Sequence, residues 1–280
     1  MPNEEQVRYW NEEGGPDWVA HERRQDLMIA PFNAVLLDAA DAQLGEHVLD
    51  VGSGFGTTSL PLARAVGDHG RVMALDVSEA MIARLRSRAA AEAVGNIISH
   101  VGDAQTEVLP AGHFRLIVSR FGVMFFDDPT AAFANIHEAL RPDGRLVFVC
   151  WQALAANEWA AGPLAVMAPV IGPIAEMPAG RPGPFGLADE EVLHEVLDGA
   201  GFSDVVLTKI ERPVVMGGGE GLDAVVEHCA GTGAARRALA AVEPEQREVA
   251  VALLRQYLVE RLADDRITFD GAVWLVRARP

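Results

Sequence analysis

The chain has 280 residues, of which 50% are hydrophobic and 22% are charged. This composition is typical of a folded globular protein and excludes an intrinsically disordered one. The 40 acidic residues outnumber the 23 basic ones, which gives a formal charge of −17. Because nucleic-acid binding depends on Lys and Arg side chains that replace phosphate counterions, we expect no nucleic-acid partner.

The distribution of apolar and cysteine residues bears on cellular location. The first six residues are acidic and polar rather than basic and apolar, so we expect no secretory signal and a cytoplasmic protein. No apolar run approaches the roughly 18 residues that a membrane span needs, so we expect no membrane partner. Cys150 and Cys229 are far apart in the sequence, and we expect both to be reduced. The sequence leaves open whether the chain forms a homodimer.

Residues 1–45 have a helical pattern with Trp10, Trp18 and Phe32 as large apolar anchors, and we expect an N-terminal helical cap. From residue 46 onward, short apolar runs alternate with helical patterns. This alternation predicts an α/β domain with a parallel sheet covered by helices on both faces. The five expected strands are rich in Val, Ile, Leu or Phe and lie at 47–51, 71–76, 96–101, 114–119 and 145–151.

The rest of the chain adds two strands and two insertions to this domain, which extends over residues 46–280. The first insertion, residues 152–186, is rich in Ala, Pro and Gly and precedes a helix expected at 189–199. We expect the sixth strand at 204–210, a second and mainly helical insertion at 213–266, and the last strand at 272–279. The prediction is a doubly wound, mostly parallel sheet of seven strands with helical insertions.

The strongest motif is Asp50-Val51-Gly52-Ser53-Gly54-Phe55-Gly56, which lies between the first expected strand and a helix. Glycines permit a sharp turn and a close approach of the backbone to a ligand, while unpaired amides at a helix start attract a carboxylate or phosphate. A dinucleotide and an amino-acid nucleoside both fit this arrangement. The dinucleotide fingerprint requires a glycine at the position of Thr57, so an NAD-dependent oxidoreductase is the weaker alternative.

Two further acidic residues follow the next two expected strands. Asp76 ends the second strand, where a carboxylate accepts hydrogen bonds from both hydroxyls of a ribose. Asp103 follows the third strand, where it either caps a helix or accepts a hydrogen bond from an exocyclic amine such as that of adenine. With Asp50 and the glycine turn, these residues predict a nucleoside-containing cofactor at the carboxyl edge of the sheet.

These motifs, together with Gly102-Asp103-Ala104 and the turn Arg141-Pro142-Asp143-Gly144, resemble the cofactor half of class I, seven-strand S-adenosylmethionine-dependent methyltransferases. The nearest group is the ubiquinone- and menaquinone-biosynthesis type. The resemblance covers residues 46–151 and implies S-adenosylmethionine as the cofactor and an antiparallel last strand. It implies that Asp50 lies by the methionine part, that Asp76 holds the ribose and that Asp103 meets the adenine amine. The expected cofactor site contains Tyr9, Trp18, Asp50, Gly52, Ser53, Gly54, Asp76, Val77, Met81, Gly102, Asp103, Ala104, Ser119 and Arg120.

The segment from Ser119 to Phe126 follows the fourth strand and lines the reaction site in enzymes of this kind. Here it is apolar and aromatic, without the Asn-Pro-Pro-Tyr type of motif that holds an amino group and without a nucleophilic Cys. It is consistent with ordinary core packing or with a pocket for a small aromatic or hydrophobic acceptor. We expect methyl transfer to such a metabolite by in-line displacement, which requires mainly alignment and exclusion of water.

A general base is needed only if the acceptor must lose a proton. His21 and His228 are the two candidates, because they lie in segments that can reach the carboxyl edge of the sheet. Four other histidines are expected at strand starts or on covering helices, away from the site: His47, His113, His137 and His194. No spacing of metal-ligating residues is present, so we expect no metal.

Residues 1–30 and the insertion at 213–266 are expected to cover the carboxyl edge as a lid, since the sheet alone supplies only the cofactor half of the crevice. The run Gly217-Gly218-Gly219 is a candidate hinge. The alternative is that the N-terminal aromatic residues only fasten a helix to the core. A protein that binds the cofactor without turnover is a further alternative function.

Overall fold

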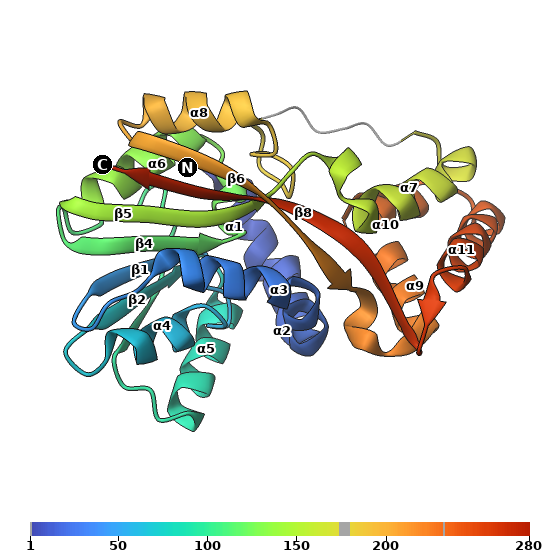
Figure 1. Ribbon diagram of the computed structural model, residues 1–280. Coiled ribbons are helices and arrows are strands. Elements are labelled where there is room, and N and C mark those ends of the chain that lie inside the picture. The colour runs from blue at the N-terminus through green and yellow to red at the C-terminus, as the bar shows by residue number, and fades with distance from the viewer. Residues whose placement is uncertain (1, 174–179, 232) are drawn as a thin grey trace.

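The computed structural model describes residues 2–173, 180–231 and 233–280. Seven strands follow the order β3-β2-β1-β4-β5-β8-β6 (Figure 1). Strands β1 to β5 pair in parallel, and β8 is antiparallel to both of its neighbours. The strands are β1 (His47–Val51), β2 (Arg71–Asp76), β3 (Ile97–Val101), β4 (Phe114–Arg120), β5 (Leu140–Trp151), β6 (Ser203–Val215) and β8 (Arg266–Arg279), and a short β7 (Leu262–Ala263) pairs with β8. The predicted fold class is confirmed.

The central strands are buried on both faces because helices cover the sheet from both sides. Leu49 of β1, Ile117 of β4 and Phe148 of β5 are completely buried. Continuous apolar runs of this kind are typical of parallel strands between two helical layers. The edge strand β3 is more open, and Ile98 is 59% exposed.

The helices that pack on the sheet include α4 (Ser59–Val66), α5 (Glu79–Ala91), α6 (Pro129–Ala139) and α8 (Glu190–Gly199). Ser78 accepts a hydrogen bond from a backbone amide in the first turn of α5, and Asp128 and Asp189 do the same for α6 and α8. Such caps satisfy amides that have no partner within the helix. They therefore fix where the loops at the carboxyl edge of the sheet end.

The chain begins with four consecutive helices: α1 (Glu4–Tyr9), the π-helix η1 (Trp10–Gly14), α2 (Gly15–Ala20) and α3 (Glu22–Ala40). The long helix α3 packs against β4, β5 and β6. It buries Phe32 and Leu36 completely. The short helix α2 packs against α5. The N-terminal segment is thus anchored to both halves of the sheet.

Strands β6 and β8 extend past the other strands as a two-stranded ribbon, paired from Ser203 with Arg279 to Val215 with Thr268 (Figure 1). Both strands are longer than expected, because backbone pairing continues through exposed polar residues such as Glu211 and Arg212 that give no apolar strand pattern. The end of the ribbon carries the short 3-10 helix η4 (Met216–Gly219), α9 (Gly221–Gly231), α10 (Gly233–Ala240) and α11 (Pro244–Val259).

The first expected insertion supplies the short 3-10 helix η3 (Leu154–Ala156) and α7 (Glu158–Ile171). Helix α7 packs against α11 and β8, so it joins the helices at the end of the ribbon. Residues 174–179 of this insertion lie outside the described residues. Two insertions that are distant in the sequence therefore form one helical cluster at the end of β6 and β8 (Figure 1).

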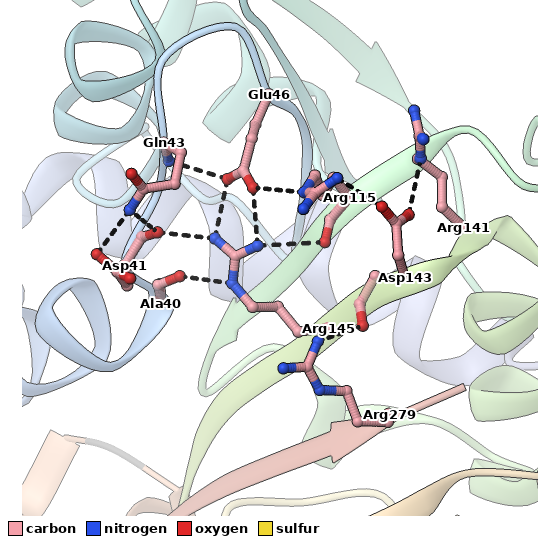
Figure 2. Close-up of polar contacts among 10 residues, drawn as sticks. Ala40, Asp41, Gln43, Glu46, Arg115, Arg141, Asp143, Arg145 and Arg279 are labelled. Carbon is pink, nitrogen blue, oxygen red and sulfur yellow. Dashed lines mark hydrogen bonds and ion pairs between the residues drawn. The ribbon is translucent and has the colours of Figure 1, made fainter.

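At the amino edge of the sheet, Arg145 joins three segments of the chain (Figure 2). Its guanidinium donates to the carbonyl oxygens of Ala40 (2.9 Å) and Asp41 (2.8 Å) at the end of α3. It also donates to both carboxylate oxygens of the buried Glu46, at 2.9 and 2.8 Å. Arginine at a helix C-terminus satisfies carbonyls that have no intrahelical partner. Arg145 therefore fastens α3 to the sheet.

Candidate cofactor and acceptor site

The glycine turn connects β1 to α4 and opens a space beside Gly54. Gly52, Gly54 and Gly56 have positive φ angles of 66°, 55° and 90°, which side chains disfavour. A Cβ atom on Gly52 would lie 2.6 Å from the Cα atom of Gly122, so glycine is required for the turn to pass β4. A Cβ atom on Gly54 would meet only the sulfur of Met81, at 4.0 Å. The backbone at Gly54 is therefore open to a ligand.

Asp76 faces the same turn from the end of β2. Its Oδ2 accepts a hydrogen bond from the backbone amide of Gly54 (2.8 Å), and its Oδ1 accepts one from that of Ser78 (2.9 Å). Burial raises the pKa of Asp76, while these two hydrogen bonds oppose the rise. Each carboxylate oxygen has a second lone pair. Asp76 can thus accept two more hydrogen bonds from a diol.

Asp50 is completely buried at the end of β1. Its Oδ2 accepts a hydrogen bond from the Ser59 hydroxyl (2.6 Å). Its Oδ1 has no hydrogen-bond partner among the described residues. Burial raises the pKa of Asp50 to about 7, against the opposing effects of Ser59 and Arg120. A cationic group beside Oδ1 would favour the ionised carboxylate.

Four more buried polar atoms have no hydrogen-bond partner within the described parts of the chain: Asn3 Oδ1, Ser53 Oγ, Asp103 Oδ2 and Arg120 Nη1. Arg120 contacts Asp26 of α3, with 3.6 Å between Nη2 and Oδ1. Burial lowers the pKa of Arg120. Unpaired buried polar atoms are rare in folded proteins and indicate a missing partner. An amino acid joined to a nucleoside offers an ammonium, a carboxylate, hydroxyls and an amine, so these residues fit S-adenosylmethionine.

The other expected cofactor residues lie at the same edge, but several of their polar groups are already paired. The Ser119 hydroxyl donates to the carbonyl of Val51 (2.8 Å) and accepts from the Gly122 amide (3.1 Å). The Gly102 amide donates to the carbonyl of Asp76 (3.0 Å). Ala104 is buried, and its carbonyl accepts from Asn135 (2.7 Å). These residues therefore shape the loops rather than present free polar groups.

The N-terminal segment lies directly on the loop after β2. The Asn11 side chain donates to the carbonyl of Val77 (2.8 Å) and accepts from the amide of Glu79 (3.1 Å). A Cβ atom on Gly15 would lie 2.2 Å from the Ser78 hydroxyl, so glycine is required for α2 to approach α5 this closely. Val77, an expected cofactor residue, is therefore held by the N-terminal segment through its carbonyl.

Trp10 is the centre of the N-terminal aromatic group. Its ring contacts those of Tyr9 and Trp18 edge-on, with centroids 5.4 and 5.8 Å away. It also contacts Phe125 of the segment after β4, at 5.2 Å. Tyr9 and Trp18 were expected in the cofactor site, but Trp10 makes the ring contact across to the sheet. Its place at the centre of this group depends on the π-helix, which no sequence signal indicated.

The apolar segment after β4 divides between core and site. Phe121 stacks on Trp151 with ring centroids 4.5 Å apart, and both residues are more than nine-tenths buried. Phe126 is also buried, whereas Phe125 is half-buried beneath Trp10. Phe121 has a φ angle of 63°, an uncommon value for a non-glycine residue. Core packing therefore accounts for Phe121 and Phe126, whereas Phe125 contacts Trp10 of the N-terminal segment.

The two candidate bases are close to each other. Nδ1 of His21 lies 3.0 Å from the carbonyl oxygen of Asp17 and 3.2 Å from its carboxylate. His228 is half-buried on α9. Burial lowers the pKa of His228, with a further lowering by Arg24 and His21 that Asp17 opposes. The structure thus brings together two histidines that are 207 positions apart, since 228 − 21 = 207.

The other expected histidine positions agree with the fold. His47 and His113 lie at the amino edge, where Nδ1 of His47 is 3.0 Å from Nε2 of His113. His137 lies on α6 and His194 on α8. In the described residues, no helix is long and apolar enough to cross a membrane. Within the same ranges, no three His, Cys, Asp or Glu side chains are grouped as metal ligands.

Sequence reasoning missed Asp26 of α3. Its carboxylate accepts hydrogen bonds from the Thr57 hydroxyl, at 2.7 and 3.0 Å, and lies 3.7 Å from Arg88 of α5. Asp26 thus connects the N-terminal helix to the glycine turn and to Arg120. No local pattern marks this residue, because its partners are distant in the sequence and meet it only in the folded chain.

Comparison with known proteins agrees with this geometry. Residues 48–144 match the family described as Methyltransferase domain. Nocamycin O-methyltransferase of Saccharothrix syringae is 35% identical over 141 residues, 50% of this chain and 50% of that protein. Ubiquinone/menaquinone biosynthesis C-methyltransferase UbiE of Shewanella frigidimarina is 30% identical over 112 residues, 40% of this chain and 45% of that protein. The chain thus spans about half the length of the curated relatives it matches.

The fold has solved relatives as well. The YcgJ protein from Bacillus subtilis superposes with a TM-score of 0.58 at 18% identity, covering 88% of this chain and 97% of that chain. This likeness shows the fold, and residues 48–144 within it match the methyltransferase domain family. The match of residues 48–144 to this family supports the S-adenosylmethionine-dependent methyltransferase prediction over the NAD-dependent alternative.

Proposed function

We propose that this protein transfers the methyl group of S-adenosylmethionine to an oxygen atom of a small hydrophobic acceptor. The observation that carries the proposal is that Asp50 Oδ1, Ser53 Oγ, Asp103 Oδ2 and Arg120 Nη1 are buried and have no hydrogen-bond partner among the described residues. Leaving such an atom unpaired costs about 1–3 kcal/mol, and more for a charged group. A cofactor that pairs with them removes this cost.

Each part of the cofactor has a matching residue. Asp50 would accept from the ammonium, Arg120 would bind the carboxylate, and Asp76 would accept from the ribose hydroxyls. Asp103 would accept from the adenine amine beside the buried side chain of Met81. When bound, the cofactor supplies an electrophilic methyl group on a sulfonium centre. The protein's tasks are then to hold the acceptor in line with that group and to exclude water.

The comparison with relatives favours oxygen as the methylated atom. The match to an O-methyltransferase is longer and more similar, at 141 residues and 35% identity, than the match to a C-methyltransferase, at 112 residues and 30%. A hydroxyl acceptor must also lose a proton, and a histidine pair lies between the N-terminal helices and α9. His228 is the proposed base, because a lowered pKa keeps its imidazole neutral near pH 7. His21, held by Asp17, is the proposed positioning residue.

The lid is proposed to consist of residues 1–30 and the helices at the end of the ribbon. Ion pairs join these parts: Glu13 with Arg236 at 2.7 Å, and Arg24 with Glu220 and Glu227 at 3.0 Å each. Gly218 packs under Arg24, where a Cβ atom would lie 2.8 Å from the Arg24 side chain. The predicted glycine hinge therefore lies at the contact between both parts of the lid.

The direct test is turnover. The protein is incubated with S-adenosylmethionine and a panel of phenols, carboxylic acids, indoles and amines, and S-adenosylhomocysteine is measured. We expect product with at least one oxygen acceptor. Cofactor binding by calorimetry without turnover on any acceptor or on a metabolite extract would favour the non-catalytic alternative. Labelled methyl groups on carbon or nitrogen alone would reject oxygen as the methylated atom.

The base is tested by His228→Gln, with His194→Gln on α8 as the matched control. We expect kcat of the first variant to fall about 10²- to 10⁴-fold, as for removal of a general base, and its pH profile to lose the limb of the base. The control variant His194→Gln should keep the kcat and the pH profile of the unchanged protein. An unchanged kcat and pH profile in His228→Gln would exclude the base.

The lid is tested by deletion of residues 1–20. We expect a folded sheet by circular dichroism, because α3 and the strands keep their packing, and a loss of turnover. Full activity of the truncated chain toward the same acceptor would show that the N-terminal segment does not form part of the acceptor site.

A further inference from the structure

A cavity of about 420 Å³ lies at the amino edge of the sheet, on the side opposite the cofactor residues. His47, His113, Arg115 and Arg141 are among its lining residues. His47 at this edge precedes Asp50 by three residues of β1, which corresponds to about 10 Å, since a strand rises roughly 3.3 Å per residue. The cavity is therefore distinct from the proposed cofactor site.

The cavity carries an excess of positive charge in a strongly acidic protein. Glu46 also lines the cavity, but Arg145 binds both oxygens of the Glu46 carboxylate, at 2.9 and 2.8 Å, and thereby neutralises its negative charge. Arg115 and Arg141 both bind the half-exposed Asp143, and Nε of Arg115 also lies 3.2 Å from Oε1 of Glu46, as Figure 2 shows. The guanidinium groups of Arg115, Arg141 and Arg145 thus share two carboxylates, those of Glu46 and Asp143, which leaves an excess of one positive charge at the cavity.

The histidine pair adds donors to the same cavity. Nδ1 of His47 and Nε2 of His113 are 3.0 Å apart, so one of the two nitrogens donates to the other. Burial lowers the pKa of His47, and the nearby His113, Arg71 and Arg141 lower it further. These neighbours are cationic or become cationic on protonation, and an anion among them would be stabilised by the same electric field.

We propose that this cavity binds a small doubly charged oxyanion, either free inorganic phosphate or the phosphoryl group of a metabolite. Arg115 and Arg141 provide planar pairs of N–H donors that match the oxygens of such a group. Protonation of the histidine pair adds a third cationic group once the anion is bound. The volume of the cavity exceeds that of a phosphate, which leaves room for the remainder of a phosphorylated metabolite.

The proposal is tested by calorimetry with inorganic phosphate and, separately, with glycerol 3-phosphate, at low ionic strength. We expect one saturable site for at least one of the two, and binding by only one would identify free phosphate or a phosphomonoester as the source. Arg141→Gln should weaken binding about fivefold, because Arg141 is half exposed and its interactions are partly screened. The matched control Arg212→Gln removes the same charge from the exposed edge of β6 and should change the affinity less than twofold.

A second measurement locates the site without relying on a variant. The imidazole resonances of the protein are followed by NMR during the phosphate titration. We expect the resonances of His47 and His113 to shift and the pKa of His47 to rise, while those of His137 and His194 remain unchanged. No saturable binding of either ligand, equal effects of Arg141→Gln and Arg212→Gln, or shifts confined to other histidines would overturn the proposal.

Discussion

The two edges of the sheet differ in whether their buried polar atoms have hydrogen-bond partners. At the amino edge, the Arg145 side chain donates to both oxygens of Glu46 and to the last carbonyls of α3, and Glu46 also accepts from the Gln43 amide at 2.9 Å. At the carboxyl edge, Asp50 and Arg120 each have a buried polar atom that is unpaired within the described residues. A paired network stabilises a fold, whereas an unpaired one lowers stability until a ligand binds.

Because of this difference, residues at the amino edge of a strand should act on the stability of the fold, and residues at the carboxyl edge should act on cofactor binding. β1 contributes Asp50 at one end, and Glu46 immediately precedes its other end. Substitutions at the amino edge should therefore change the free energy of unfolding with little effect on cofactor affinity. Substitutions at the carboxyl edge should change cofactor affinity first.

The largest expected effect is at Asp76. In Asp76→Ala, two ribose hydroxyls lose a charged acceptor, and each such hydrogen bond is worth about 1.5–3 kcal/mol. We expect the dissociation constant for S-adenosylhomocysteine, measured by calorimetry, to rise more than about a hundredfold. The matched control Asp38→Ala removes an exposed carboxylate of α3 and should leave the constant unchanged. Equal dissociation constants for Asp76→Ala and Asp38→Ala would show that Asp76 does not bind the cofactor.

Arg145→Gln should have the opposite effect to Asp76→Ala: it should lower the stability of the fold and leave the cofactor affinity nearly unchanged. Glu46 is 5% exposed and Arg145 18% exposed, so loss of the guanidinium leaves a nearly buried carboxylate with fewer partners. Burial alone would raise the pKa of Glu46, but the hydrogen bonds from Arg145 and Gln43 lower it. We expect the free energy of unfolding of the variant, measured by urea denaturation, to be about 2 kcal/mol lower than that of the unchanged protein. Cofactor affinity should stay within twofold, and a large loss of affinity would contradict the separation of the two edges.

The pH dependence of Glu46 follows from the sign of its shift. Its folded pKa lies below its unfolded value, so its stabilising effect is present above the unfolded pKa and disappears as the pH falls through the folded pKa. Arg145→Gln should therefore lose less stability on acidification than the unchanged protein does.

A smaller effect is expected from the pH dependence at Asp50. Its pKa of about 7 lies above the unfolded value, so the ionised form is disfavoured in the folded protein without a bound cation. Binding of the cofactor ammonium should release a proton from Asp50, and affinity for S-adenosylhomocysteine should rise about tenfold from pH 6 to pH 8. Calorimetry in buffers of different ionisation enthalpy measures that proton. Asp50→Asn, which has no proton to release, should lose the rise, and an equal rise in this variant would assign it to another group.

The smallest expected effect concerns the lid. Glu13 and Arg236 are each at least half exposed, so their ion pair is worth about 0.5 kcal/mol. Arg236→Gln should raise KM for the acceptor about twofold and leave the affinity for S-adenosylhomocysteine unchanged. High salt should produce the same change in the unchanged protein, because salt screens exposed ion pairs. A KM that responds to neither change would separate this ion pair from acceptor binding.

The cofactor half of the fold was predictable because its signals are local. The apolar strand 47–51, the glycine turn and Asp76 follow one another within a single βαβ unit, and strand β1 was predicted with its observed bounds. The cap Ser78 was equally local, since its hydroxyl accepts from the amide of Met81 only three residues away. The class of domain followed from these short-range patterns.

The N-terminal helices and the ribbon of β6 and β8 were less predictable, because their contacts are long-range. The ribbon of β6 and β8 extends through polar, exposed residues that lack a strand pattern, so both strands were expected to be shorter. The contact of Trp10 with Phe125 and that of Asp26 with Thr57 join residues that are distant in sequence. The network of Arg145 was hidden for the same reason, although the turn before it was recognised.

The ribbon has a consequence for how such a protein can change. The chain leaves the sheet for the helices at Val215 and returns at Thr268, and these two residues are paired neighbours. Everything between them is therefore a cassette with adjacent ends, which a short hairpin turn could replace at little entropic cost. The matched methyltransferase family covers residues 48–144 and stops before this cassette. A lineage could exchange the cassette, and with it the acceptor, while the cofactor half of the sheet kept its sequence.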